Sequence, residues 1–143
     1  GQGRAGDAQA LRRLGEALGI AVTVAPLVAL AGGEVSSTAI RQALSDGRPR
    51  DAARMLGHWH RIEGPVLHGE KRGRLLGYPT ANLSLAGLHL PRFGVYAVEV
   101  DVLDGPHAGS YGGEAPNLEA FLFDFAGDLY GATLSVALVE FLR

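Results

Sequence analysis

The stretch that decides the fold is Val95-Tyr96-Ala97-Val98-Glu99-Val100-Asp101-Val102, in which apolar residues alternate with charged or small ones. Successive side chains of a β-strand point to opposite faces, so a period of two is typical of a strand with one buried face. The buried face of this strand would carry Tyr96, Val98, Val100 and Val102. We therefore predict a strand over residues 95–102 that contributes to a hydrophobic core.

Further strands are predicted on the C-terminal side of this stretch. The run Glu119–Phe125 also alternates, and would place on one face Glu119, Phe121, Phe123 and Phe125. Residues 126–128 are expected to form a turn, and Gly131–Leu142 a further long strand. Short antiparallel strands joined by Gly and Asp turns predict a small closed barrel or sandwich for residues 58–143.

Residues 1–57 have a different pattern. The expected elements are a helix capped by Asp7 and ended by Gly19, a buried strand over Ile20–Ala25, a helix capped by Ser36 or Ser37, and a helix from Pro49 to Gly57. A single strand has no sheet to join, so we expect this region to be the C-terminal part of an α/β domain. The predicted domain boundary lies near residue 57.

Composition and charge narrow the classes of function. Of the 143 residues 47% are apolar and 20% charged, which excludes a disordered chain. The formal charge of −2 disfavours nucleic acid and anionic membranes as partners. The absence of Cys excludes disulfides and zinc-thiolate sites and agrees with a cytoplasmic protein.

The sequence has neither the pattern of a membrane-spanning segment nor that of a signal peptide. The longest apolar run, Ala21–Ala31, is broken by Thr23 and Pro26 and is too short to cross a bilayer. The N-terminal residues have no apolar core of a signal peptide. Because the first residue is Gly rather than Met, we expect the chain to begin inside a longer protein.

The segment His68–Asn82 is the most informative for chemistry. Its glycines alternate with basic residues, as the order Gly69, Lys71, Arg72, Gly73, Arg74 and Gly77 shows. Amide groups of such a loop can approach phosphate oxygens. Thr80 and Asn82 would face the same side if extended, and their oxygens suit a phosphate-bound Mg²⁺. A solvated Gly/Arg hairpin loop remains the alternative, and on composition alone it is the commoner one.

A second candidate for phosphate binding precedes the second predicted helix. Ser36, Ser37 and Thr38 supply hydroxyl and amide groups at a helix start, and Arg41 adds positive charge one turn later. The alternative is a plain N-cap followed by a surface Arg.

Several long motifs resemble a known family. They are His68-Gly69-Glu70-Lys71-Arg72-Gly73-Arg74, Gly77-Tyr78-Pro79-Thr80-Ala81-Asn82, Leu90–Val98, Leu118–Phe125 and Gly127–Gly131. Together they resemble the signature of riboflavin kinases, in particular that of the bacterial bifunctional riboflavin kinase/FMN adenylyltransferases. Upstream, residues 3–7 and 35–41 resemble late motifs of the adenylyltransferase domain.

The resemblance implies a six-stranded antiparallel barrel at residues 58–143, preceded at residues 1–57 by the C-terminal part of an α/β nucleotidyltransferase domain. It implies transfer of the ATP γ-phosphoryl group to the ribityl 5′-hydroxyl of riboflavin, giving FMN, and adenylylation of FMN to FAD in the intact protein. The resemblance implies that Glu119 is the catalytic base and that Thr80 and Asn82 are Mg²⁺ ligands. The residues implied in ATP binding by the kinase are Gly69, Lys71, Gly73, Gly77, Tyr78, Pro79, Thr80 and Asn82. Those implied in the ATP site of the adenylyltransferase are Ser36, Ser37, Thr38 and Arg41.

The residues around Glu119 agree with the role of a base. By alternation Glu119 lies on the face of the Phe row, and partial burial there would raise the pKa of its carboxyl group. The alternative is that Glu119 starts the strand at a solvent-exposed rim. Two rival functions also stay open: a non-catalytic flavin or nucleotide-binding barrel, and a purely structural interaction barrel. The oligomeric state is not predicted.

The sequence departs from the family in three places. No His-x-Gly-His motif of the adenylyltransferase exists, since His58 and His60 only flank Trp59, so we expect no FAD synthesis by this chain alone. Between Gly109 and Asn117 the family has a core strand and an Arg-Pro-Thr segment that we do not find. We favour loss of residues from the sequence over a deleted strand, because a missing barrel strand would leave unpaired edges. The family's helix beyond Arg143 is also absent.

Overall fold

The computed structural model describes residues 3, 6–31, 33–68, 80–123 and 129–143. The chain forms two compact units, Gly1–Glu34 and Val35–Arg143. In the described part of the chain no helix is long and apolar enough to span a membrane.

The first unit contains helix α1 (Ala8–Leu18) and a short hairpin of β1 (Ala29–Leu30) and β2 (Gly33–Glu34). The predicted caps of α1 are confirmed, because the Asp7 carboxylate accepts a hydrogen bond from the Ala10 amide at 2.6 Å and Gly19 adopts a φ of 69°. Left-handed backbone of this kind favours glycine.

The predicted strand at Ile20–Ala25 is wrong. These residues have no strand assignment, and the Ile20 amide instead donates to the carbonyl of Gly15 at the end of α1. Val22 packs so closely on Gly15 that a Cβ there would overlap its side chain. Without a partner strand in the described part of the unit, the β-branched run packs against the helix instead.

Helices α2 (Ser37–Ser45) and α3 (Pro49–Leu56) form as predicted. The Ser36 hydroxyl caps α2 by accepting from the Ala39 amide at 3.1 Å, and Gly57 ends α3 with a φ of 79°. The two helices pack through a small cluster of buried side chains, Ala43, Leu44 and Ala52.

Both helices belong to the second compact unit, which begins before α2. The Arg92 amide donates to the carbonyl of Leu44 at 2.8 Å, and Arg50 forms an ion pair with Glu140 at 3.6 Å. The units therefore divide the chain at Glu34/Val35, whereas the sequence analysis divides it near residue 57. The domain assignment of residues 1–57 and 58–143 stays a prediction, and so does the nucleotidyltransferase origin of the first part.

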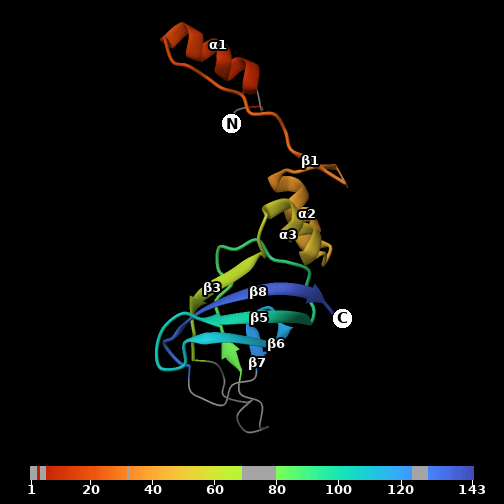
Figure 1. The fold of residues 1–143 in the computed structure, drawn as a ribbon, viewed down its shortest axis with the longest axis vertical. Coiled ribbons are helices and arrows are strands. Elements are labelled where there is room, and N and C mark those ends of the chain that lie inside the picture. Colours follow the sequence, from red (N-terminus) through yellow and green to blue (C-terminus); the bar gives the residue numbers. More distant parts are fainter. Residues whose placement is uncertain (1–2, 4–5, 32, 69–79, 124–128) are drawn as a thin grey trace. The chain divides into compact units, whose positions relative to one another are not determined.

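The second unit is built on a curled sheet of six antiparallel strands, which confirms the predicted fold class (Figure 1). The strands are β3 (Arg61–Pro65), β4 (Ala81–Asn82), β5 (Tyr96–Val102), β6 (Gly109–Asn117), β7 (Ala120–Phe123) and β8 (Thr133–Phe141). Their spatial order is β3-β8-β5-β6-β7-β4. A bridge between Leu67, just beyond β3, and Asn82 of β4 joins the two edges of the sheet.

The interior of the curled sheet is the main hydrophobic core. The predicted alternation of β5 is confirmed, since Tyr96, Val98, Val100 and Val102 are all buried. Facing side chains complete the core, among them Ile62, Leu118, Phe121, Leu134, Val136 and Leu138. Burial of these side chains supplies the main driving force for folding of the barrel.

The strand expected to be missing between Gly109 and Asn117 is present as β6. It pairs with β5 from Val102↔Gly109 to Tyr96↔Ala115 and with β7 on its other side. Glycines at 109, 112 and 113 remove the apolar alternation by which a strand is recognised, and pairing on both sides compensates for their weak strand preference. The alternative of a deleted strand is therefore wrong, and the favoured alternative, a loss of residues between Gly109 and Asn117, stays a prediction.

Candidate active site

The pairing of β4 with β7 brings together sequence-predicted residues that are distant in the chain. Asn82 lies opposite Ala120, and the Leu83 amide donates to the carbonyl of Glu119 at 2.9 Å. Thr80 immediately precedes β4. Thr80, Asn82 and Glu119 therefore lie along one edge of the sheet, at the ends of β4 and β7.

The side chains of this edge divide between the core and the solvent. Ala81 and its partner Phe121 are buried in the core. Since neighbouring side chains of a strand point to opposite faces, Asn82 faces away from the core, where it is half-buried. Thr80 is exposed. Their polar oxygens are thus available outside the apolar interior.

Glu119 lies in the turn between β6 and β7 and is exposed. The register of this strand pair shifts between Glu114 and Asn117, so that Leu118, and not Glu119, is the buried neighbour of the strand end. The predicted partial burial of Glu119 in the Phe row is wrong. Its position matches the alternative of a carboxylate at an exposed rim. Residues 124–128, with the expected Phe125 and the expected turn, lie outside the described residues.

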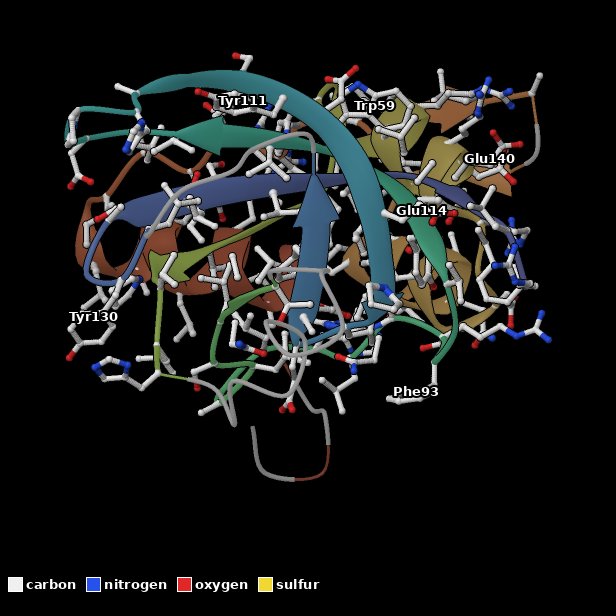
Figure 2. The ribbon with its side chains drawn as sticks, turned by 90° about the horizontal axis from the view of Figure 1, so that it is seen from below. Trp59, Phe93, Tyr111, Glu114, Tyr130 and Glu140 are labelled. Atoms are coloured by element: carbon white, nitrogen blue, oxygen red, sulfur yellow. The ribbon has the colours of Figure 1, made fainter. Side chains whose placement is uncertain are left out.

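A cavity of about 570 Å³ opens beside Glu119. Its walls are mostly apolar and are formed by Ser84, Leu85, Ala86, Leu90, Pro91, Phe93, Leu118 and Glu119. Figure 2 shows Phe93 at the periphery of the sheet. The volume and the mixture of apolar walls with a single carboxylate are typical of a site for a small organic ligand.

The loop between β4 and β5, which lines this cavity, is in hydrogen-bond contact with α2 through His89. One ring nitrogen of His89, Nε2, lies 3.1 Å from the carbonyl of Arg41 and 3.1 Å from the hydroxyl of Ser45. A carbonyl can only accept, so Nε2 carries the proton and donates. The guanidinium of Arg92 lies over the Phe141 ring at 4.5 Å. These contacts hold the outer wall of the cavity.

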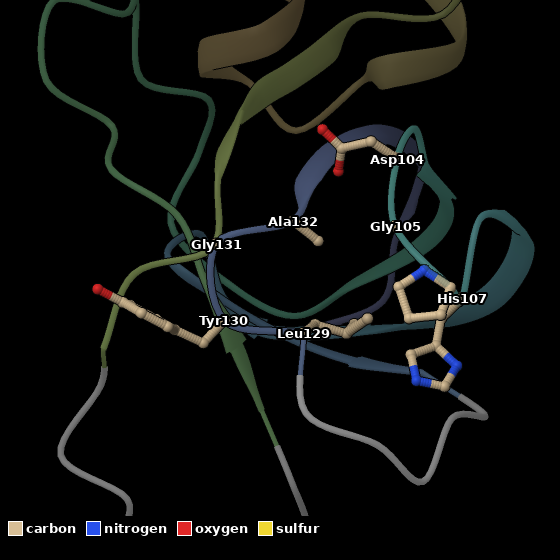
Figure 3. A pocket seen from close by; sticks show the side chains of 8 residues that line it. Asp104, Gly105, His107, Leu129, Tyr130, Gly131 and Ala132 are labelled. Carbon is tan, nitrogen blue, oxygen red and sulfur yellow. The ribbon is translucent and has the colours of Figure 1, made fainter.

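A second hollow of about 330 Å³ lies elsewhere on the sheet (Figure 3). It is lined by Asp104, Gly105, Pro106, His107, Leu129, Tyr130, Gly131 and Ala132. The ring of Tyr130 stacks on His68 with centroids 3.6 Å apart, and the Val66 amide donates to the carbonyl of Ala132 at 2.8 Å. In Figure 2 Tyr130 and Phe93 lie at opposite sides, so the two hollows are separate.

The predicted phosphate-binding residues of the loop lie outside the described residues. They are Gly69, Lys71, Gly73, Gly77, Tyr78 and Pro79. The chain enters this loop at His68 beside the second hollow and leaves it at Thr80 beside β4.

The four predicted adenylyltransferase residues lie around the start of α2, not on the β4–β7 edge. The Ser36 hydroxyl is occupied as the N-cap, while Ser37, Thr38 and Arg41 are exposed. This arrangement agrees with a plain N-cap as well as with a phosphate contact. Among the described residues no group of three or more acidic or His side chains is arranged to hold a metal ion.

Asn117 is a residue that the sequence analysis missed. Its side-chain oxygen Oδ1 accepts from the amides of Glu119 and Ala120, both at 2.9 Å. An Asn placed two residues before a predicted site residue is a signal for such a turn, because Asn side chains commonly bond the backbone two residues on.

Comparisons with known proteins agree with this geometry. The family model described as "Flavokinase: Riboflavin kinase" matches residues 56–143. The bifunctional riboflavin kinase/FMN adenylyltransferase of Pseudomonas fluorescens is 43% identical over 151 residues, which cover 98% of this chain and 48% of that protein. The protein of the same description from Escherichia coli K12 is 40% identical over 152 residues, which cover 100% of this chain and 49% of that protein.

A solved structure is also similar. The crystal structure described as a macrolide-efflux protein from Streptococcus pneumoniae has a TM-score of 0.74 and 34% sequence identity, covering 96% of this chain and 47% of that one. The chain thus spans about half the length of the relatives it matches. The alignments of 151 and 152 positions exceed the 143 residues of this chain, so those relatives carry residues that it lacks.

The family assignment rests on sequence and structure together. The family model covers more than half of the chain, and the two relatives are similar along almost all of it. The sheet order and the β4–β7 edge supply the fold that the sequence resemblance implies. The chain therefore belongs to the riboflavin kinase family.

Proposed function

We propose that the intact protein transfers the γ-phosphoryl group of ATP to the 5′-hydroxyl of riboflavin, giving FMN and ADP. The observation that supports this proposal is the pairing of β4 with β7, which brings the strand that carries Asn82 next to Glu119, a residue that lines an apolar cavity. Phosphoryl transfer depends mainly on positioning and on neutralising charge, and this edge offers groups for both.

The cavity beside Glu119 is proposed to receive riboflavin. Its apolar walls, including Leu85, Leu90 and Phe93, suit the flat ring system, and its size is within the range of small-molecule sites. The Glu119 carboxylate would accept the proton of the 5′-hydroxyl as the hydroxyl oxygen attacks the γ-phosphorus. The bond from that phosphorus to the bridging oxygen breaks, and ADP leaves. A carboxylate at this position would serve as the general base of the transfer.

ATP is proposed to bind from the side of the second hollow. That hollow adjoins His68, where the chain enters the loop predicted to hold the phosphates, and the loop returns to the β4 edge at Thr80. A nucleotide with its base near Tyr130 could in this way direct its phosphates toward Glu119.

Magnesium fits the residues that the structure describes at this edge. Thr80 and Asn82 supply a hydroxyl and an amide oxygen outside the core, and Mg²⁺ usually takes few protein ligands together with phosphate and water oxygens. When bound, the ion would neutralise charge on the phosphates. Thr80 and Asn82 would orient these oxygens relative to Glu119.

The exposure of Glu119 favours one rival function, a flavin-binding or nucleotide-binding barrel without catalysis. Such a protein would need the cavity but not the carboxylate. Riboflavin binding with no FMN formed would support this rival, and we use it as an outcome of the test below.

The decisive experiment measures FMN formation and ADP release by the intact protein, with ATP and riboflavin each omitted in turn. We expect ADP in an amount equal to the sum of FMN and FAD, because FAD is made from FMN, and only when both substrates are present. No FMN, or ADP release that does not depend on riboflavin, would overturn the proposed kinase activity.

We also propose that the intact protein adenylylates FMN, with Ser36, Ser37, Thr38 and Arg41 contacting ATP. The position of these residues at the N-terminus of α2 and the exposure of Arg41 support this proposal. Replacing Arg41 by Ala should slow FAD formation and spare FMN formation. Equal losses in both reactions would contradict a specific role of Arg41 in adenylylation.

A further inference from the structure

Asn117 connects the end of β6 to the residue proposed as the base. It is the last residue of β6, and Glu119 follows it in the turn that leads to β7. The Asn117 oxygen Oδ1 accepts two hydrogen bonds, from the amides of Glu119 and Ala120, each 2.9 Å long. The Asn117 side chain therefore closes the turn that contains Glu119.

Two further contacts, made by Leu83 and Leu118, also hold the backbone of this turn. The carbonyl of Glu119 accepts from the Leu83 amide at 2.9 Å, next to Asn82. The preceding Leu118 is only 1% exposed and anchors the turn in the core. The backbone of Glu119 is thus held at both its amide and its carbonyl group.

The side chain of Glu119 has no such support among the residues that the structure describes. It is exposed, and within the described part of the chain its carboxylate makes no recorded hydrogen bond or ion pair. Its position relative to Asn82 and the cavity is consequently set by the backbone from which it projects. A catalytic group whose own side chain is unsupported depends on the support of its backbone.

We propose that Asn117 is a positioning residue for Glu119: it holds the turn in the one conformation that projects the carboxylate toward the substrate hydroxyl. The inference rests on the proposed function of Glu119 as the base. The register shift between Glu114 and Asn117 explains why the turn requires such a residue, because regular pairing between β6 and β7 is interrupted there.

The expected effect is on turnover rather than on binding of ATP. Loss of the Oδ1 acceptor frees the amides of Glu119 and Ala120, and the carboxylate then samples unproductive positions. Misplacement of a reacting group by about 1 Å can cost roughly 100-fold in rate, so we expect Asn117→Ala to lower kcat by roughly 10–100-fold.

The test compares Asn117→Ala with Asn117→Asp in the intact protein. Aspartate retains an oxygen at the Oδ1 position and should keep kcat within roughly threefold of wild type, since it still accepts from both amides. Both variants should leave the KM for ATP unchanged. Asn117→Ala with wild-type kcat would overturn the inference, and so would Asn117→Asp as impaired as Asn117→Ala.

A double variant separates positioning from general structure. In a Glu119→Gln protein the base is already lost, so adding Asn117→Ala should change kcat by less than roughly twofold if Asn117 acts through Glu119. An undiminished further loss in the double variant would overturn the inference. Ser110→Ala is the matched control, because it removes a 2.7 Å hydrogen bond to Asp101 from the same strand away from the site. Its kcat should equal that of wild type.

Failure of this inference can be told from failure of the proposed function. If wild type forms FMN and Glu119→Gln does not, the function stands and only the Asn117 variants decide the inference. If Glu119→Gln is fully active, the role of Glu119 fails and the inference with it. Should Asn117→Ala not fold, Asn117→Ser, whose hydroxyl can also accept, takes its place: near wild-type kcat supports the inference and a loss equal to that of Glu119→Gln overturns it.

Discussion

The β5–β8 wall and the β4–β7 edge of the same sheet differ in both pairing and burial. Strands β5 and β8 pair from Val102↔Leu134 to Tyr96↔Phe141, and every second side chain of β5 is buried. Within the described residues, strands β4 and β7 pair at Ala81↔Phe121 and Asn82↔Ala120. The proposed site residues lie on this short edge, outside the core.

The difference separates the residues that stabilise the fold from those that would perform the chemistry. The wall buries a row of side chains from each of its two strands, whereas Thr80 and Glu119 are exposed and contribute little to the core. Variants of the wall should therefore alter the free energy of unfolding, and variants of the edge should alter turnover. A single variant that lowered both the free energy of unfolding and the turnover would contradict this separation.

The largest expected effect on stability is at Leu134, which is fully buried in β8. Leu134→Ala leaves a cavity in the core and should lower the free energy of unfolding by about 2–5 kcal/mol. The matched control is Leu103→Ala, since Leu103 is 54% exposed, and its effect should stay within about 0.5 kcal/mol. Urea unfolding followed by circular dichroism measures both. Equal losses in the two variants would contradict the assignment of the core.

The next prediction concerns the edge. Thr80→Ala and Asn82→Ala should each lower kcat by roughly 100-fold, because a lost contact to the phosphate-bound ion is worth several kcal/mol in the transition state. Thr80→Ser keeps the hydroxyl and should keep most of the activity. The unfolding midpoints of all three should remain near that of wild type. Near-normal turnover of both Ala variants would remove these residues from the site.

The smallest predicted effect is a pH dependence from His60. Burial, followed by the neighbouring His89 and His58, lowers the pKa of His60, whose Nε2 is buried without a hydrogen-bond partner in the described structure. The unfolded chain, with a pKa of about 6.5, then binds the proton more readily than the folded protein. Stability is therefore full above about pH 6.5 and falls below it, by at most about 1.4 kcal/mol per pH unit.

His60→Gln should flatten this decline in unfolding experiments between about pH 5 and 7, because it removes the group that titrates. His58→Gln, at an exposed histidine, is the control, and it should retain most of the decline in stability at low pH. An unchanged slope in His60→Gln would assign the pH dependence to other groups.

The parts of the fold that could be predicted from the sequence are those with local signals. The period of two in β5 and the capping residues Asp7, Ser36 and Gly57 each determine structure through their immediate neighbours. The six-stranded antiparallel fold came from the family resemblance rather than from the periodicity, which left a barrel and a sandwich equally open.

The parts that could not be predicted depend on distant partners. Gly-rich β6 becomes a strand because β5 and β7 pair with it, and Ile20–Ala25 fails to become one for lack of a partner among the described residues. The exposure of Glu119 follows from the turn that Asn117 closes, which strand alternation does not anticipate. The proximity of Asn82 to Glu119 likewise arises from long-range pairing.

The most direct test of the proposed site is the rate of FMN formation in a single turnover by Glu119→Gln in the intact protein, with the enzyme in excess over riboflavin and with ATP saturating. Gln keeps the size of the side chain but cannot accept the proton, so the rate should fall by about 10²–10⁴-fold. Glu99→Gln, at an exposed Glu on the outer face of β5, is the control and should match wild type. A Glu119→Gln protein that retains more than half of the wild-type rate would contradict the account.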